Sequence, residues 1–315
     1  MNASAPALRS PLNLIFLLVG LSCLGCDSLI PPRPPIGDPK EQEGQQASVP
    51  GYVAPRSVGR FQGPWKTWYL HRLGSQIVGV TSLQADDPLR IEGDSSEALV
   101  EFRRDETLRF RSGKTQFIRQ TVARSTESPT GEVQKFDLKV RSGPIDASAF
   151  GGRTRDRINI TWAGAIRREP KSIVWPENAA GLFALEQTLR REPIKRGETR
   201  RIESLMPSLA NFGWIELKCL GQASVAMLNG DYRTLLEIEA VWYESAQPTD
   251  ALILWSTENG EIQKTLQPAT RIESFAVSES VAERSFKPTS PQAVFVDVES
   301  VATEDAESVE LAERD

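Results

Sequence analysis

The chain has 315 residues, 39% of them hydrophobic and seven of them tryptophan, which is enough for a real core in one large or two small domains. Its net charge is −5 at pH 7, and residues 290–315 alone carry −7, with eight acidic side chains against Arg314. The remainder is close to neutral and shows no electrostatic footprint of a nucleic-acid-binding protein. The single histidine excludes a two-histidine metal site.

The N-terminus predicts an export signal over residues 1–25. An apolar run from Leu12 to Leu24 follows Arg9, the only charged residue before it. These 13 residues suit the core of a signal peptide, which needs about 7–15, and fall short of the about 20 that span a bilayer. A transmembrane anchor is therefore the weaker interpretation.

Small residues close this run, and Gly25 directly precedes Cys26. The pattern resembles a bacterial lipobox, which implies that Cys26 receives diacylglycerol and becomes the first residue of the mature protein. Cys23 stands where a lipobox usually has leucine. Cys23 is itself preceded by Gly20-Leu21-Ser22, which is a poorer but possible lipobox. The alternatives are cleavage by an ordinary signal peptidase and a C-x-x-C metal or redox pair, which needs a second ligand pair or a folded context. The resemblance implies an exported protein, lipid-anchored to the cell membrane and facing the periplasm or the exterior.

Two segments on either side of the central region have compositions typical of disorder. Residues 26–64 are rich in Pro, Gln, Glu and Gly, and they suit a tether between a lipid and a domain. Residues 283–315 are predicted to form an acidic disordered tail, whose plain interpretation is a solubilising segment. Between them we predict a β-rich domain over residues 65–282.

Alternation of apolar and polar residues dominates this predicted domain. It is clearest in Phe136, Leu138 and Val140, in Ile158, Ile160 and Trp162, and in Leu236, Ile238, Ala240 and Trp242. A period of two with one polar face indicates antiparallel strands that are wet on one side. Asn229-Gly230 and Asn259-Gly260 each separate two apolar runs and predict tight hairpin turns, because Asn-Gly tolerates positive φ.

Residues 177–192 instead have a helical period, with Ala179, Leu185 and Leu189 on one face. A weaker helical pattern covers residues 202–209. We therefore predict an α+β protein that is mainly antiparallel β, with a curved sheet or half-barrel packing a mid-chain helix. One domain and two similar β halves around the helix are both compatible with this pattern.

No catalytic constellation is visible in the sequence. His71 lies on a predicted strand and is expected at the surface or edge of the sheet. Cys219 shares a face with Ile215 and Leu217, which is typical of a small buried hydrophobe rather than a nucleophile. There is no Gly-x-Ser-x-Gly elbow, and the stretch Ser112–Gln116 lacks the first glycine of a phosphate-binding loop. We expect no catalytic residue, no cofactor and no metal site.

Four stretches carry a further resemblance: Trp68–Val80, Gly181–Leu209, Leu228–Trp242 and Ile253–Thr265. They look like the β-rich N-terminal region that precedes a transglutaminase-like core in some large exported bacterial proteins. The last stretch is also similar to hairpins of periplasmic lipoprotein carriers, which wrap a half-barrel around helices. A transglutaminase core needs a cysteine, a histidine and an aspartate together, and this chain does not continue into one. The resemblance therefore implies an accessory domain, and it leaves open a core on a neighbouring chain.

Three functions follow from these observations. The first is a non-catalytic, membrane-anchored envelope lipoprotein whose β domain binds a partner protein or an envelope component. The second is a carrier that holds an acyl chain or another hydrophobic ligand in a half-barrel. The third is the accessory part of a transglutaminase-like acyl-transfer or peptidase protein. The residues expected to line the carrier's pocket, which an ordinary core would use equally, are Ile158, Ile160, Trp162, Leu236, Ile238 and Trp242.

Overall fold

The computed structural model describes residues 61, 63–88, 98–112, 115–166, 168–177, 179–206 and 211–287. The predicted signal peptide and Cys26 lie outside these residues, as do nearly all of the predicted tether and most of the predicted tail.

Within this described part, fourteen antiparallel strands form one continuous, open sheet. The strands are β1 (Trp65–Leu73), β2 (Gln76–Ala85), β3 (Val100–Ser112), β4 (Thr115–Glu127), β5 (Val133–Ser142), β6 (Ile145–Thr154), β7 (Arg157–Gly164), β8 (Lys171–Val174), β9 (Thr199–Leu205), β10 (Phe212–Ala226), β11 (Tyr232–Glu244), β12 (Gln247–Ser256), β13 (Ile262–Gln267) and β14 (Ile272–Val277). Each meander, β1–β8 and β9–β14, pairs strands that follow one another, and β1 pairs with β14 to join the two. The predicted mainly antiparallel fold is confirmed, as one sheet rather than two separate halves.

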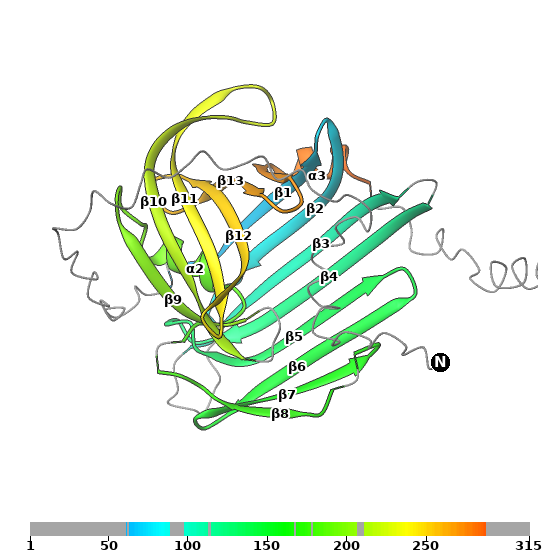
Figure 1. Cartoon of the computed structure of the whole chain (residues 1–315), viewed down its shortest axis with the longest axis vertical. Helices are drawn as coiled ribbons and strands as arrows, with labels where there is room; N and C mark the ends of the chain where they lie inside the picture. The colour runs from blue at the N-terminus through cyan, green and yellow to red at the C-terminus, as the bar shows by residue number, and fades with distance from the viewer. Residues whose placement is uncertain are drawn as a thin grey trace, which may run out of the picture.

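Helix α2 (Ala184–Arg191) lies inside the bend of this sheet (Figure 1). Leu185 and Leu189 on the helix are buried in one cluster with Leu83 of β2, Leu217 of β10 and Ile238 of β11. We call the side of the sheet that faces α2 the inner face and the opposite side the outer face. The structure is therefore a curved half-barrel around a mid-chain helix, as the sequence predicted.

The helix begins seven residues later than the predicted range of 177–192. Before it, Ala180 forms a bridge to β9: its N–H donates to the Glu203 carbonyl, and its carbonyl accepts from the N–H of Leu205. This pairing takes up the backbone groups that an earlier helical turn would use. The weaker helix predicted over residues 202–209 is wrong in its described part, because β9 runs to Leu205.

Both predicted Asn-Gly turns are confirmed. Gly230 joins β10 to β11 with φ of 86°, and Gly260 joins β12 to β13 with φ of 77°. These values lie in the left-handed region, which glycine adopts without steric cost.

The two edge strands, β8 and β9, do not pair with each other. Side chains nevertheless connect the two edges of the sheet. Lys171 Nζ on β8 donates to Asn211 Oδ1 next to β10 at 3.0 Å. The ring of Trp175, just after β8, lies edge-on against Phe212, with 4.9 Å between ring centroids. The half-barrel is thus held together at this end without closing its hydrogen-bond ladder.

The second helix, α3 (Glu279–Ser285), follows β14 and packs beside β1 (Figure 1). Its Ala282 is fully buried, and Phe286 directly after it is also buried. The guanidinium of Arg109 lies 4.7 Å from the centroid of the Phe286 ring. Arg109 is on the outer face of β3, because it alternates with the inner-face residue Leu108. The chain after α3 therefore emerges on the outer face.

Candidate functional site

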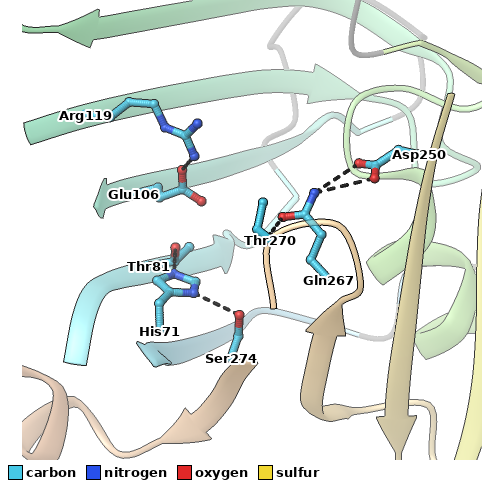
Figure 2. Close-up of polar contacts among 8 residues, drawn as sticks. All are labelled: His71, Thr81, Glu106, Arg119, Asp250, Gln267, Thr270 and Ser274. Carbon is cyan, nitrogen blue, oxygen red and sulfur yellow. Dashed lines mark hydrogen bonds and ion pairs between the residues drawn. The ribbon is translucent and has the colours of Figure 1, made fainter. Parts of the chain in front are cut away.

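Five polar side chains cross the inner face on five neighbouring strands, and we call them the polar row: Arg119, Glu106, Thr81, His71 and Ser274. Figure 2 shows them in this order on β4, β3, β2, β1 and β14. Register explains the alignment, because Glu106 pairs directly with Thr81, and His71 pairs directly with Ser274. Side chains opposite each other on antiparallel strands point to the same face.

His71 lies next to Ser274 near the β14 end of the polar row and is only 8% exposed. Its Nδ1 lies 2.8 Å from Ser274 Oγ, and its Nε2 lies 2.6 Å from Thr81 Oγ1. Burial lowers the pKa of His71, and the nearby Arg119 charge lowers it further while Glu106 opposes this. The ring is therefore neutral near pH 7, with one nitrogen donating and the other accepting. The expectation of a surface or edge histidine is wrong, because the curvature of the sheet covers this position.

Glu106 and Arg119 form an ion pair at the other end, with Arg119 Nη2 donating to Glu106 Oε1 at 3.1 Å. Burial alone would raise the pKa of Glu106, but the charges of Arg119 and Arg104 and the hydrogen bond from Arg119 outweigh it. The pKa of this carboxyl lies below its usual range, so Glu106 is ionised at neutral pH.

The Glu106–Arg119 pair is slightly more accessible than His71. The side chains of Arg119 and Glu106 are 12% and 20% exposed, respectively. Phe117, two residues before Arg119 on the same face of β4, is 37% exposed. An ion pair and an exposed aromatic ring thus share the part of the inner face that α2 does not fill.

A second polar group lies beside this region on β12 and β13 (Figure 2). Gln267 Nε2 donates weakly to Asp250, with distances of 3.4 and 3.5 Å to the two carboxylate oxygens. Thr270 Oγ1 donates to Gln267 Oε1 at 3.0 Å. Burial raises the pKa of Asp250, although hydrogen bonds from Ala251 and Gln267 oppose this.

The geometry of His71 differs from that of a catalytic triad. A triad histidine bonds a carboxylate on one nitrogen and a nucleophile on the other. Both nitrogens of His71 instead contact hydroxyls, and Cys219 is buried in the apolar cluster around α2. The arrangement is suited to holding fixed hydrogen-bond partners and charges rather than to activating a nucleophile.

The six residues proposed to line a carrier pocket fall into two buried clusters. Ile158, Ile160 and Trp162 of β7 pack with Trp175 and neighbouring strands. Leu236 and Ile238 of β11 pack in the cluster around α2, and Trp242 packs partly buried against it. The structure does not gather them at one site, and their role in lining a pocket stays a prediction.

The polar row was not identified from sequence alone, apart from His71. Glu106 and Arg119 belong to stretches dense in charge, where alternation does not mark a core face. The sequence does offer one signal. Phe117 and Arg119 are two residues apart in "TQFIRQT", so they share a face of one strand, and Phe110 in "RFRS" belongs to the adjacent strand and pairs with Phe117.

Among the described residues, no group of three or more His, Cys, Asp or Glu side chains is arranged to hold a metal ion. No helix in the same part of the chain is both long and apolar enough to cross a membrane.

No protein-family model matches the chain, and no curated protein matches it in sequence. The chain is similar to a crystal structure described as a β-barrel-like protein of the domain of unknown function DUF1849 from Brucella abortus. That similarity has a TM-score of 0.49 and 8% sequence identity, and it covers 70% of this chain and 98% of the other.

Proposed function

We propose that this protein is a non-catalytic, membrane-anchored envelope lipoprotein whose half-barrel binds a partner protein or envelope component on its inner face. The observation that carries the proposal is the β4 end of the polar row. There the Glu106–Arg119 ion pair lies beside the exposed ring of Phe117. Arginine and aromatic side chains are both enriched at protein-binding surfaces.

The packing around α2 favours this function over a carrier. An acyl chain needs an apolar cavity, and the apolar part of the inner face is occupied by Phe183, Leu185 and Leu189 of the helix segment. At the β4 end of the polar row the inner face exposes the aromatic ring of Phe117, next to the largely buried charges of Arg119 and Glu106. A polar or charged segment of another molecule is the better complement to such a surface.

The anchoring part of the proposal is supported by the sequence around Cys26. A lipid on this residue and a proline-rich tether over residues 26–64 would hold the half-barrel near a membrane. A diacylglycerol group gives two acyl chains, which anchor a protein stably, whereas one chain binds reversibly.

The proposal is tested by placing a photo-reactive benzoylphenylalanine at Phe117 in the full chain, produced in its own cells. We expect irradiation to give a discrete protein or glycan adduct. The same substitution at Tyr232, which is 72% exposed on β11, is the control for random encounters and should not give this adduct.

The variant Arg119→Met removes the charge while keeping an apolar stem, and it should lower the yield of the adduct. Arg119→Met leaves the Glu106 carboxylate without its ion-pair partner. The double variant Glu106→Gln, Arg119→Met removes this carboxylate as well and should show the same lowered yield. Identical adducts at positions 117 and 232, or an adduct unchanged by Arg119→Met, contradict the proposal. An adduct to an acyl chain that extracts into organic solvent supports the carrier instead.

A further inference from the structure

The outer face of β3–β7 is rich in exposed basic side chains. Among the side chains that the structure describes, strand pairing places five exposed ones here, and Arg103 and Arg109 are half-buried on the same face. The five are Arg124, Lys135, Lys139, Arg141 and Arg157. The same strands place four acidic residues there: Glu101, Asp105, Asp137 and Asp146. We call this surface the basic outer face, and its net charge is positive.

Three of the four acidic residues on this face are engaged in ion pairs, the first being Asp105 with Arg103 at 2.5 Å. Asp137 pairs with Lys139 at 3.2 Å, and Asp146 pairs with Arg141 at 3.2 Å. Within the described part of the chain, no ion pair is formed by the exposed side chain of Arg124. Its positive charge is available for an anionic ligand.

Lys135 is likewise exposed and forms no ion pair with the described residues. Arg157 is exposed, and among the described residues its guanidinium donates to the hydroxyl and carbonyl of Ser172 and forms no ion pair. An apolar side chain lies among these charges: Phe150 of β6 is 48% exposed and pairs directly with Asp137. A ligand that carries both acidic and apolar groups would therefore be the best complement to this face.

The chain itself delivers such a ligand to this place. Lys287, the last described residue, accepts a hydrogen bond from Arg109 Nη2 on its carbonyl oxygen at 2.9 Å. Arg109 belongs to the basic outer face, so residues 288–315 start there. They carry eight acidic side chains against Arg314, and apolar residues 294–296 precede Asp297.

The reach of this segment is sufficient. A chain of 28 residues spans up to about 90 Å when extended. Four strand spacings separate β3 from β7, and at about 4.8 Å each they amount to about 19 Å. Its attachment at one border of the face keeps its effective concentration high, which favours weak intramolecular binding.

We propose that the acidic segment 288–315 docks on the basic outer face of β3–β7 of the same chain. Its carboxylates lie against Arg124, Lys135 and Arg157, and its apolar residues cover Phe150. The segment thereby shields this face from other anionic partners, such as a membrane surface.

The test uses the full chain with benzoylphenylalanine in place of Phe150. After irradiation and proteolysis, mass spectrometry identifies which peptide the label has joined. We expect cross-links to peptides from residues 288–315 within one molecule, and their loss at 1 M salt, where the Debye length falls to about 3 Å. Mixing heavy-isotope and unlabelled protein separates cross-links within a chain from those between chains.

A matched pair of triple variants tests the charges. Arg124→Glu, Lys135→Glu and Arg157→Glu together should abolish the cross-link. Lys195→Glu, Lys218→Glu and Arg233→Glu make the same charge change at exposed positions elsewhere and should leave it intact.

Three results overturn the proposal: no cross-link to the segment, cross-links only between chains, or equal loss in both triple variants. Vesicles containing phosphatidylglycerol provide the remaining comparison. If position 150 joins lipid in preference to residues 288–315, the face is a membrane-binding surface and the proposal is wrong.

Discussion

The side-chain amide of Gln187 on α2 donates to Glu127 Oε2 on β4 at 2.5 Å, and Arg191 donates in turn to Gln187 Oε1. All three side chains are buried. The chain of hydrogen bonds fixes the helix against the inner face. Burial raises the pKa of Glu127 to about 7, although the hydrogen bond from Gln187 and the charge of Arg191 oppose this.

This raised pKa predicts how stability depends on pH. Glu127 titrates near 4.5 when unfolded and near 7 when folded, so the folded state holds its proton more tightly. Its favourable contribution is complete below pH 4.5 and is lost as the pH rises through 7. The loss is on the order of 3 kcal/mol in the free energy of unfolding, at about 1.4 kcal/mol for each pKa unit.

The measurement is urea unfolding of the wild type and of Glu127→Gln between pH 4 and pH 8. His71 has a lowered pKa, so its contribution to the free energy of unfolding rises with pH, opposite to that of Glu127. Both proteins contain His71, so the difference between their two profiles isolates the effect of Glu127. We expect the free energy of unfolding of Glu127→Gln, measured relative to that of the wild type, to be higher at pH 8 than at pH 4. Parallel profiles for the two proteins contradict the prediction.

The contacts of His71 predict a non-additive set of variants. His71→Phe leaves the hydroxyls of Thr81 and Ser274 without their partner, and Thr81 is buried. A buried hydroxyl that loses its hydrogen bond costs about 1–3 kcal/mol. Adding Thr81→Val to His71→Phe should recover part of this cost in chemical denaturation. Strictly additive losses would show that the hydroxyl contacts contribute nothing.

The two Asn-Gly turns predict different responses to the same substitution. A Cβ at Gly230 meets nothing within 4 Å. Gly230→Ala should therefore lower the free energy of unfolding only by the cost of placing alanine at positive φ, about 1–2 kcal/mol. A Cβ at Gly260 lies 1.8 Å from the carbonyl oxygen of Leu189 on α2. Gly260→Ala must therefore displace the helix or the hairpin. We expect a clearly larger fall in its thermal midpoint, and equal falls would refute this packing.

Lipidation at Cys26 predicts the mass of the mature N-terminus. Mass spectrometry of protein extracted from membranes should show diacylglycerol on Cys26 as the first residue. Cys26→Ser should release the protein from the membrane fraction, while Cys23→Ser should not. An unmodified terminus at any other residue is incompatible with the predicted anchor.

Much of the fold follows from local patterns in the sequence. Alternation identified the buried faces around Ile160, Leu217 and Ile238, and all three side chains are buried in the structure. The apolar stripe of the helix identified Leu185 and Leu189 as core residues, which they are. These features depend on the period of a strand or a helix, which neighbouring residues determine.

The candidate site depends on long-range register and could not be predicted in this way. Glu106 meets Thr81 and His71 meets Ser274 only because β3, β2, β1 and β14 pair in one particular alignment. The curvature of the same sheet buries His71, which was expected at the surface or edge of the sheet.

The two Asn-Gly turns show the division most simply. The dipeptide is enough to predict both hairpins, because it tolerates the positive φ that each turn requires. Only the tertiary structure brings the backbone of α2 against Gly260 and leaves Gly230 in open space. Likewise, the sequence marks Glu127 as one carboxylate among many, and the packing of α2 over β4 removes it from water and raises its pKa. Local chemistry determined the elements of this protein, and the way the sheet bends around one helix decided which of their side chains are buried together.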